Sequence, residues 1–267
     1  MITSTSNPRV QAVVRLRKRR GREAAGLFLV EGRREVERAV AAGVGIEALY
    51  MCPELGGTAP EAGAAADPTE VSAAVFAKLS YREGPDGVLA VARAFPTDLG
   101  RLAPPADALV LVVAGLEKPG NLGAVVRSAA AAGAYAVVAA DPVTDVFNPN
   151  TVRASQGALF SLPVAVGEAA EVRTWLDRHH VPAYAAGPKG SSLAPWDLPL
   201  AAAAALVVGA EDRGLDDAWF DHAAAPVSIP MPGARQGVDS LNAASAAAVL
   251  LFEAVRQRAA ATPAPAG

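Results

Sequence analysis

Apolar and polar positions along the chain follow two periods that alternate from segment to segment. Short apolar runs bounded by glycine, proline or charged residues predict buried strands, and apolar residues at spacings of three and four predict helices. The expected strands are residues 27–30, 46–51, 87–92, 109–114, 135–140, 162–166, 183–186, 205–208 and 227–230. The expected helices are one that opens at Asn7-Pro8 and others at residues 31–42, 71–79, 122–132 and 239–258.

The order of these elements predicts an α/β protein with two domains. Residues 1–95 form a small α/β unit, and residues 96–107, with three prolines and few large apolar residues, form a linker. From residue 108 to 258, strands and helices alternate, which is typical of a mostly parallel sheet covered by helices on both faces. The Ala/Pro-rich residues 259–267 are expected to be disordered.

The last predicted helix is apolar along its whole length. Six of its residues recur at helical spacing and predict one stripe that must be buried. They are Leu241, Ala244, Ala248, Leu251, Phe252 and Val255.

The composition favours a soluble globular protein without a membrane or metal partner. Hydrophobic residues make up 52% and charged residues 19%, and no apolar run reaches the roughly 18 residues that a membrane helix needs. Cys52 is the only cysteine, so the chain has neither an internal disulfide nor a thiolate metal cluster. The polar amino terminus lacks the features of a secretory signal, and we expect a cytoplasmic protein.

Positive charge is concentrated near the amino terminus although the formal net charge is only −3. The residues between 9 and 22 include no acid, and a local basic patch attracts polyanions whatever the overall charge. A solvated basic helix is the alternative, but we favour contacts with RNA phosphates. The basic residues are Arg9, Arg15, Arg17, Lys18, Arg19, Arg20 and Arg22.

Three segments that follow predicted strands carry polar residues suited to a ligand site, because ligands of parallel sheets bind beyond the carboxyl ends of the strands. The first runs from Gly115 to Arg127 and contains Asn121, which is also a good helix cap. Its Arg127 can present a guanidinium to a phosphate, or it can be an ordinary surface residue. This segment is therefore a candidate phosphate site.

The second segment, Gly209 to Leu215, places Glu211 in a glycine turn. Glu211 can hold Arg127 or a ligand amine, or cap the helix expected near Asp216. The segment lacks the spacing of dinucleotide-binding loops and of P-loops, so neither cofactor class is supported.

The third segment joins Ile229-Pro230-Met231-Pro232-Gly233 to Ser240-Leu241-Asn242 at the start of the last helix. Its prolines cannot donate backbone hydrogen bonds, which favours a rigid loop at a strand end. Ser240 and Asn242 are candidate helix caps as well as candidate site residues.

Together, these three segments resemble the signature motifs of the SpoU (TrmH-like) RNA 2'-O-ribose methyltransferases, in the same order and at similar separations. The amino-terminal unit resembles, by arrangement, the L30e-like RNA-binding domain of many members. The resemblance implies an S-adenosylmethionine-dependent homodimer of the SPOUT class, whose carboxyl-terminal domain is tied in a deep trefoil knot. Pattern reasoning alone would not propose a knot, because chains are generally unknotted.

The resemblance also implies roles for individual residues. Arg127 would grip the phosphate beside the target ribose or act as a base, and we favour the grip because a guanidinium stays protonated. Asn121, Glu211, Ser240 and Asn242 would position Arg127, the ribose or the cofactor, and Arg153 would contact RNA. The residues implied to bind the cofactor are Gly187, Gly209, Ala210, Ile229, Met231 and Leu241.

Some alternatives stay open. Ala210 stands where the family often has asparagine, and the 233–240 loop is longer than usual, so the sequence does not define its path into the knot. The ribosomal-protein-like domain favours ribosomal RNA over transfer RNA, in a housekeeping or an antibiotic-resistance role. A silent RNA-binding protein of the same fold is a rival interpretation. A small-molecule α/β enzyme is another, although it leaves the basic helix unexplained.

Overall fold

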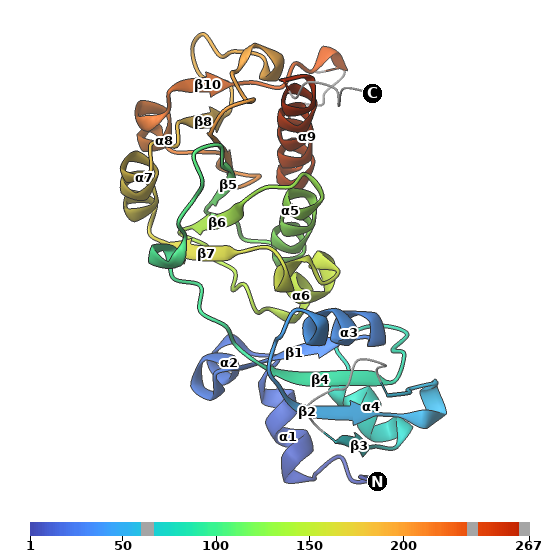
Figure 1. Ribbon diagram of the computed structural model, residues 1–267. Helices are drawn as coiled ribbons and strands as arrows, with labels where there is room; N and C mark the ends of the chain where they lie inside the picture. The colour runs from blue at the N-terminus through green and yellow to red at the C-terminus, as the bar shows by residue number, and fades with distance from the viewer. Residues whose placement is uncertain (60–66, 234–239, 262–267) are drawn as a thin grey trace. The chain divides into compact units, whose positions relative to one another are not determined.

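The computed structural model describes residues 1–59, 67–233 and 240–261. The chain divides into two compact units (Figure 1). The amino-terminal unit is Met1–Pro96 with Asp145–Ser161, and the carboxyl-terminal unit is Thr97–Thr144 with Leu162–Gly267.

These units differ from the domains expected from the sequence at two places. Residues 97–107, expected as a linker, group with the carboxyl-terminal unit and include a short helix, η2 (Leu99–Arg101). Residues 145–161, expected in the second domain, group with the amino-terminal unit. Of the expected tail, residues 259–261 continue the last helix, and residues 262–267 lie outside the described part of the chain.

The amino-terminal unit is built on a four-stranded sheet in the order β1-β4-β2-β3. Strand β4 is antiparallel to β1 and β2, whereas β3 is parallel to β2. The strands are β1 (Leu27–Glu31), β2 (Ile46–Met51), β3 (Pro68–Glu70) and β4 (Val88–Arg93). The prediction missed β3, because its three residues show no apolar alternation and are defined only by pairing with β2.

Helices pack on this sheet through apolar faces. The expected basic helix is two helices, because the chain leaves helical geometry between Arg15 and Arg19. Val10, Val13 and Leu16 are buried. The helices are α1 (Pro8–Arg15), α2 (Arg19–Ala25), α3 (Arg33–Ala41), α4 (Ala73–Leu79) and α6 (Pro149–Ser155), with the 3₁₀ turns η1 (Pro53–Leu55) and η3 (Ala158–Phe160).

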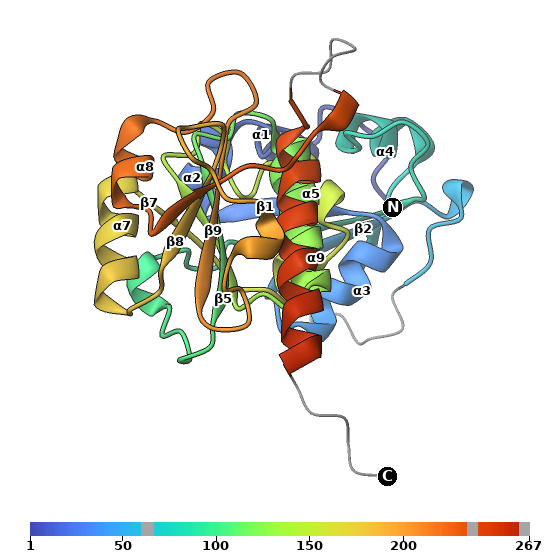
Figure 2. The ribbon, with the colours of Figure 1, turned by 90° about the horizontal axis from the view of Figure 1, so that it is seen from above.

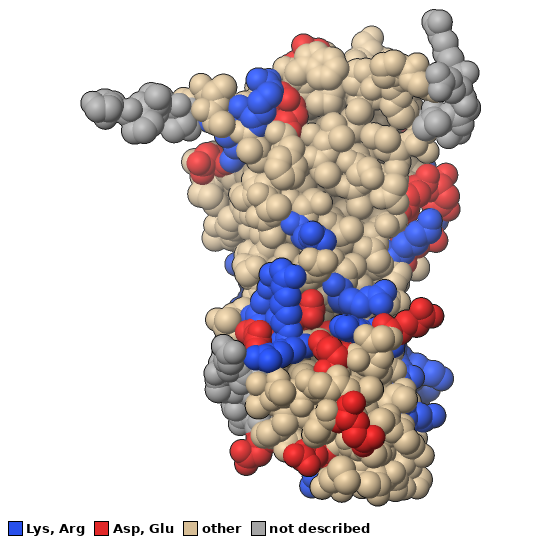
Figure 3. All heavy atoms as spheres, turned by 90° about the vertical axis from the view of Figure 1, so that its right-hand side faces the viewer, with Lys and Arg blue, Asp and Glu red and all other residues tan. Residues whose placement is uncertain are grey.

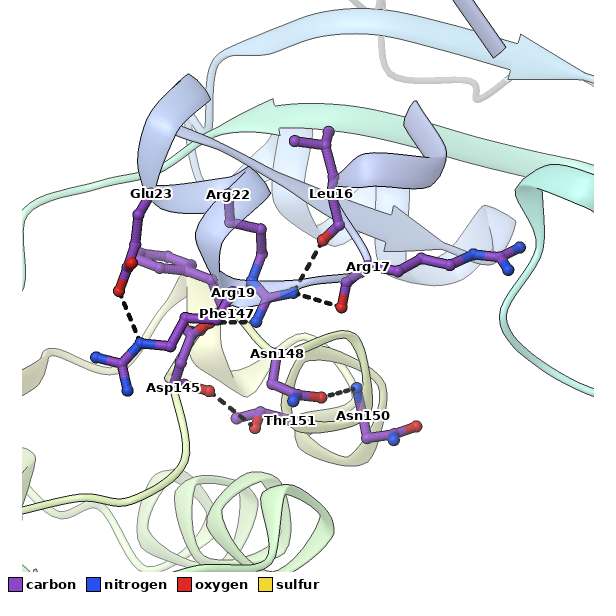
Figure 4. A network of polar contacts seen from close by, with 10 residues as sticks. All are labelled: Leu16, Arg17, Arg19, Arg22, Glu23, Asp145, Phe147, Asn148, Asn150 and Thr151. Carbon is purple, nitrogen blue, oxygen red and sulfur yellow. Dashed lines mark hydrogen bonds and ion pairs between the residues drawn. The ribbon is translucent and has the colours of Figure 1, made fainter. Parts of the chain in front are cut away.

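Residues 145–161 are held in the amino-terminal unit by a buried ion pair (Figure 4). Arg22 Nε donates to Asp145 Oδ2 at 2.8 Å, and its Nη1 donates to the carbonyl oxygens of Leu16 and Arg17 at 2.8 and 2.9 Å. The ring of Phe147 lies 4.9 Å from that of Phe28, centroid to centroid. Arg22, one of the residues of the basic run, is therefore an internal contact.

The carboxyl-terminal unit contains a six-stranded sheet in the order β10-β8-β9-β5-β6-β7, and its strand pairs are all parallel. This arrangement agrees with the predicted alternation. Continuous apolar runs form the central strands because both faces of the sheet are covered. The strands are β5 (Leu109–Ala114), β6 (Ala136–Ala140), β7 (Val164–Gly167), β8 (Ala183–Ala186), β9 (Ala204–Gly209) and β10 (Ala225–Val227).

Helices cover both faces of this sheet (Figure 2). Helices α7 (Ala169–Arg178) and α8 (Asp217–His222) lie on one side, and α5 (Pro119–Ala131) and α9 (Ala243–Ala261) lie on the other. Helix α9 packs against α5, β9 and the short helix η4 (Pro195–Asp197). No helix of the described residues is long and apolar enough to span a membrane.

The buried stripe of α9 is not the predicted one. Of the six predicted positions only Leu251 is buried, while Phe252 is 50% exposed. The helix buries mostly small residues, which let it approach α5 closely. Its buried residues are Ala243, Ala247, Leu250, Leu251 and Ala254.

Candidate active site

A cavity of about 260 Å³ opens in the carboxyl-terminal unit where three neighbouring parallel strands end. Ala186, Gly209 and Val227, the last residues of β8, β9 and β10, all line it. This is the place where open parallel sheets bind ligands, because the loops leaving adjacent strands converge there.

The six residues implied to bind the cofactor lie together around this cavity. Apolar side chains come from Ile229, Met231 and Leu241, and backbone comes from Gly187, Gly209 and Ala210. The remaining lining residues are Ala186, Pro188, Val208, Glu211, Gly214, Val227, Ser228, Ser240, Ala243 and Ala246. Residues 234–239 of the loop whose path was uncertain lie outside the described part of the chain.

Two glycines shape the cavity wall. A Cβ on Gly209 would lie 2.2 Å from the backbone carbon of Gly214, so only glycine lets the following loop fold back on β9. The Gly214 amide closes that loop by donating to the Ala210 carbonyl at 2.8 Å. At Gly187, a Cβ would lie 2.9 Å from the ring of Phe220.

The polar residues of the three motifs meet at Glu211. Its Oε1 accepts a hydrogen bond from Asn121 Nδ2, on α5, and another at 3.4 Å from Asn242 Nδ2, beside α9. One carboxylate oxygen therefore joins side chains that are about 90 and 30 residues distant in the sequence. Since Glu211 also lines the cavity, this cluster forms part of its rim.

The structure separates the capping roles that the sequence left open. Asn242 is a cap as well as a partner of Glu211, because its Oδ1 accepts from the amides of Ala244 and Ser245 at 3.0 and 3.4 Å. Asn121 does not cap α5, which begins earlier because Pro119 is favoured in the first helical turn. The helix that Glu211 was thought to cap, α8, is capped by Asp216.

Arg127 and Ser240 have no hydrogen-bond or ion-pair partner for their side chains in the described part of the chain. Arg127 is exposed on α5, six residues after Asn121 and so about 9 Å further along the helix axis. No hydrogen bond or ion pair joins it to Glu211, the partner that the sequence suggested, or to another described residue. Ser240 is exposed and lines the cavity. Both side chains are therefore available to a ligand.

The residues expected to contact RNA lie in the amino-terminal unit. Figure 3 shows another face of this unit, the right-hand side of Figure 1, where basic and acidic side chains are mixed. Five of the residues expected to contact RNA are exposed with no partner for their side-chain charge among the described residues: Arg9, Arg15, Lys18, Arg20 and Arg153. Arg19 is exposed but paired with Glu23 at 2.7 Å.

Arg17 differs from its neighbours in the basic run. Its Nη2 donates to the carbonyl oxygens of Lys78, at 2.5 Å, and of Ser80, at the end of α4. Carbonyl oxygens at a helix carboxyl terminus carry partial negative charge and attract cations. The guanidinium of Arg17 is therefore engaged within the unit, which corrects the expectation that it is free for RNA.

Sequence reasoning missed two features of the site. Ser228 lines the cavity but lies inside the stretch predicted as a strand. Strand β10 ends earlier, at Val227. An ion pair between Glu117 and Arg213 also joins the first two motif loops. Both residues were visible inside the motifs, but their contact depends on the adjacency of β5 and β9.

Family models and curated relatives match this arrangement. The model of the SpoU rRNA Methylase family matches residues 108–252, and that of the MRM3-like substrate binding domain matches residues 7–90. A 23S rRNA (uridine(2479)-2'-O)-methyltransferase of Streptomyces viridochromogenes is 38% identical over 66% of this chain, and the match spans 62% of that protein. The 23S rRNA (guanosine(2553)-2'-O)-methyltransferase RlmP of Bacillus subtilis is 31% identical, over 94% of this chain and 97% of its own length.

Solved structures agree with the fold. A crystal structure titled RNA 2'-O ribose methyltransferase is 44% identical with a TM-score of 0.85, over 97% of this chain and 99% of that chain. The SpoU methyltransferase AviRb of Streptomyces viridochromogenes, in complex with AdoMet, is 30% identical with a TM-score of 0.85, over 96% of this chain and all of that one. The chain therefore belongs to the SpoU rRNA Methylase family.

Proposed function

We propose that the protein transfers the methyl group of S-adenosylmethionine to a ribose 2'-oxygen of ribosomal RNA. The observation that carries the proposal is the convergence of Asn121 and Asn242 on Glu211, at the rim of a cavity beyond three strand ends. A chain that only bound RNA would not need this convergence of three polar side chains beside a ligand-sized cavity. The names of the family relatives support the same activity.

The cavity residues fit S-adenosylmethionine. Ile229, Met231 and Leu241 offer apolar surface for an adenine ring, and the strand ends offer backbone amides and carbonyls for polar groups. The volume of about 260 Å³ is slightly below the range of roughly 300 to 1,000 Å³ usual for small-molecule sites. Within this family, a structural neighbour with 30% identity binds AdoMet.

The bound sulfonium supplies an activated methyl group, so the protein mainly has to align the acceptor oxygen and assist removal of its proton. Asn121 and Asn242 fix the Glu211 carboxylate at the cavity rim. Arg127, on the same helix as Asn121, would grip the phosphate beside the target ribose. Ser240 would donate to or accept from the ribose or the cofactor.

Binding and product mapping test the proposal. We expect the protein to bind S-adenosylmethionine in a calorimetric titration and Gly209→Ala to lose that binding, because the new Cβ collides with the Gly214 backbone. Gly100→Ala, at a position with open space around its Cβ, is the matched control. Mapping of 2'-O-methylation in total RNA with and without the protein should then identify one ribosomal nucleotide.

The outcomes separate the rival functions. No cofactor binding by the wild-type protein would leave the silent RNA-binding interpretation. A methylated transfer RNA would replace the ribosomal substrate, and the identity of the ribosomal nucleotide would distinguish a housekeeping site from a resistance site.

The exposed basic residues of α1 and α2 are proposed to bind RNA phosphates. Replacing Arg15, Lys18 and Arg20 with glutamine should weaken RNA binding and lower the slope of log K against log salt by about one unit for each lost phosphate contact. Arg17→Gln should instead destabilise the amino-terminal unit, because Arg17 binds carbonyls of α4. Filter binding at several salt concentrations measures the slope. An unchanged slope would show that these residues form a solvated surface and do not contact RNA phosphates.

Three further properties are proposed from family membership. Two copies would associate through α9, where Val249 and Phe252 are 44% and 50% exposed, and sedimentation analysis would detect the dimer.

The carboxyl-terminal segment would be threaded through a trefoil knot, which is consistent with the return of the chain from edge strand β10 to a helix packed on α5. We place the protein in the cytoplasm, because the named relatives modify ribosomal RNA.

A further inference from the structure

An exposed ion pair joins two loops at the rim of the candidate active site. Arg213 Nη2 bonds to Glu117 Oε1, and Arg213 Nε lies 3.7 Å from Asp212 Oδ2. The two loops follow β5 and β9, which are paired and parallel, so both leave the sheet at the same edge. Arg213 lies two residues after Glu211, and Glu117 lies four residues before Asn121.

This ion pair is too exposed to serve mainly as a structural clasp. The side chains of Arg213 and Glu117 are 65% and 45% exposed, and water screens such pairs strongly. The loop after β9 is already closed by the backbone hydrogen bond from Gly214 to Ala210. The guanidinium of Arg213 is therefore held weakly, at a position next to the residues that would receive the target ribose.

We propose that Arg213 contacts an RNA phosphate near the target nucleotide and that Glu117 competes with the RNA for its guanidinium. The inference rests on the proposed function, because it assumes that RNA occupies this rim. Once Glu117 has left, the Arg213 guanidinium can bind a phosphate through two parallel hydrogen bonds. Lys118 and Arg127, both exposed on the same loop and helix, add positive charge to the path of the RNA backbone.

The competition gives Glu117 a role in specificity. A small anion has to displace the Glu117 carboxylate from Arg213 through this one contact. An RNA chain also binds elsewhere on the protein, and that binding offsets the cost of displacing Glu117. Removing the negative charge should consequently tighten binding, and removing the positive charge should weaken it. A structural clasp would predict the same direction for both substitutions.

Opposite changes in KM test the proposal. Steady-state methyl transfer to transcribed 23S ribosomal RNA should show a KM about 2- to 5-fold lower for Glu117→Gln, with unchanged kcat. Arg213→Gln should raise KM by about 10-fold and lower the salt slope by about one unit. The double variant should resemble Arg213→Gln, because Glu117 acts only through the arginine.

Asp217→Asn is the matched control, because it removes one negative charge from another exposed ion pair of the same unit, that with Lys189 at 2.6 Å. Asp217→Asn should leave KM unchanged. If it lowers KM as much as Glu117→Gln does, the effect of Glu117→Gln comes from the loss of any negative charge on this unit, and the proposal is overturned. Changes in the same direction for Glu117→Gln and Arg213→Gln would also overturn the proposal. Direct filter binding of the RNA gives the same readout if the protein binds no cofactor, so failure of the proposed function can be recognised separately.

Discussion

Arg127→Ala is expected to lower kcat for methyl transfer to 23S ribosomal RNA by roughly 10²- to 10⁴-fold, the range for loss of one catalytic or charge-stabilising group. S-adenosylmethionine binding should stay at the wild-type level, because Arg127 is exposed on α5 and is not among the residues that line the cavity. Single-turnover transfer and a cofactor titration on the same preparation measure the two effects.

Two further measurements distinguish a phosphate grip from a base. If Arg127 grips phosphate, added methylguanidinium should partly restore transfer by Arg127→Ala, and Arg127→Lys should keep the wild-type dependence of kcat on pH. If Arg127 is the base, the lysine variant should shift that profile. Arg178→Ala, at an exposed arginine of α7 on the other face of the sheet, is the matched control. Near-normal transfer by Arg127→Ala would show that Arg127 takes no part in methyl transfer.

The sequence predicts the sheet of the carboxyl-terminal unit well because its strands are continuous apolar runs. Strand β8 covers the predicted residues 183–186 without a shift. Strand β10 is shifted to Ala225–Val227, and it includes Pro226, which an edge strand tolerates. The predicted strand, residues 227–230, lay too far along the chain because Ile229 is apolar. In the structure Ile229 lines the cavity and is not part of the strand.

Periodicity fails where a helix is apolar on most sides. Helix α9 is rich in alanine, so spacing alone cannot decide which face meets the sheet. The predicted stripe included Phe252, whereas the folded helix, which packs against α5, buries the smaller Ala243 and Ala247. The choice depends on the neighbouring helix and not on α9 itself.

The motifs located the candidate site because each follows a strand of one sheet, but they did not define the contacts within it. Glu211 was expected to hold Arg127 or a ligand amine or to cap a helix, whereas in the folded chain it accepts hydrogen bonds from Asn121 and Asn242. The basic run was similarly ambiguous. The sequence does not distinguish Arg17 and Arg22 from the other basic residues of the run, yet Arg17 binds a backbone carbonyl and Arg22 a carboxylate within the amino-terminal unit.

The grouping of residues 145–161 could not be predicted for the same reason. Arg22 and Asp145 are 123 residues apart in sequence, and nothing local to Asp145 indicates a partner. The pair is nearly dry, since the two side chains are 5% and 14% exposed. Its removal should therefore have a large effect on stability.

Asp145→Ala is expected to destabilise the amino-terminal unit by about 3 to 5 kcal/mol, because it leaves the Arg22 guanidinium buried without a carboxylate. Replacing both partners, as Arg22→Met with Asp145→Leu, should recover most of that loss, since no unpaired buried charge remains. Glu47→Ala is the matched control in the same unit. Its partner Arg93 lies at a similar distance, 2.8 Å, but the side chains are 70% and 47% exposed, so the loss should be below about 1 kcal/mol.

The two units can be followed separately. The three tryptophans, Trp175, Trp196 and Trp219, all belong to the carboxyl-terminal unit, so their fluorescence during urea unfolding reports on that unit alone. Amide hydrogen exchange in β1 and β4 reports on the other, and Asp145→Ala should lower protection there by roughly 10²- to 10⁴-fold. Equal effects of Asp145→Ala and Glu47→Ala would contradict the role of burial. A loss confined to the tryptophan signal would mean that Asp145 stabilises the carboxyl-terminal unit instead.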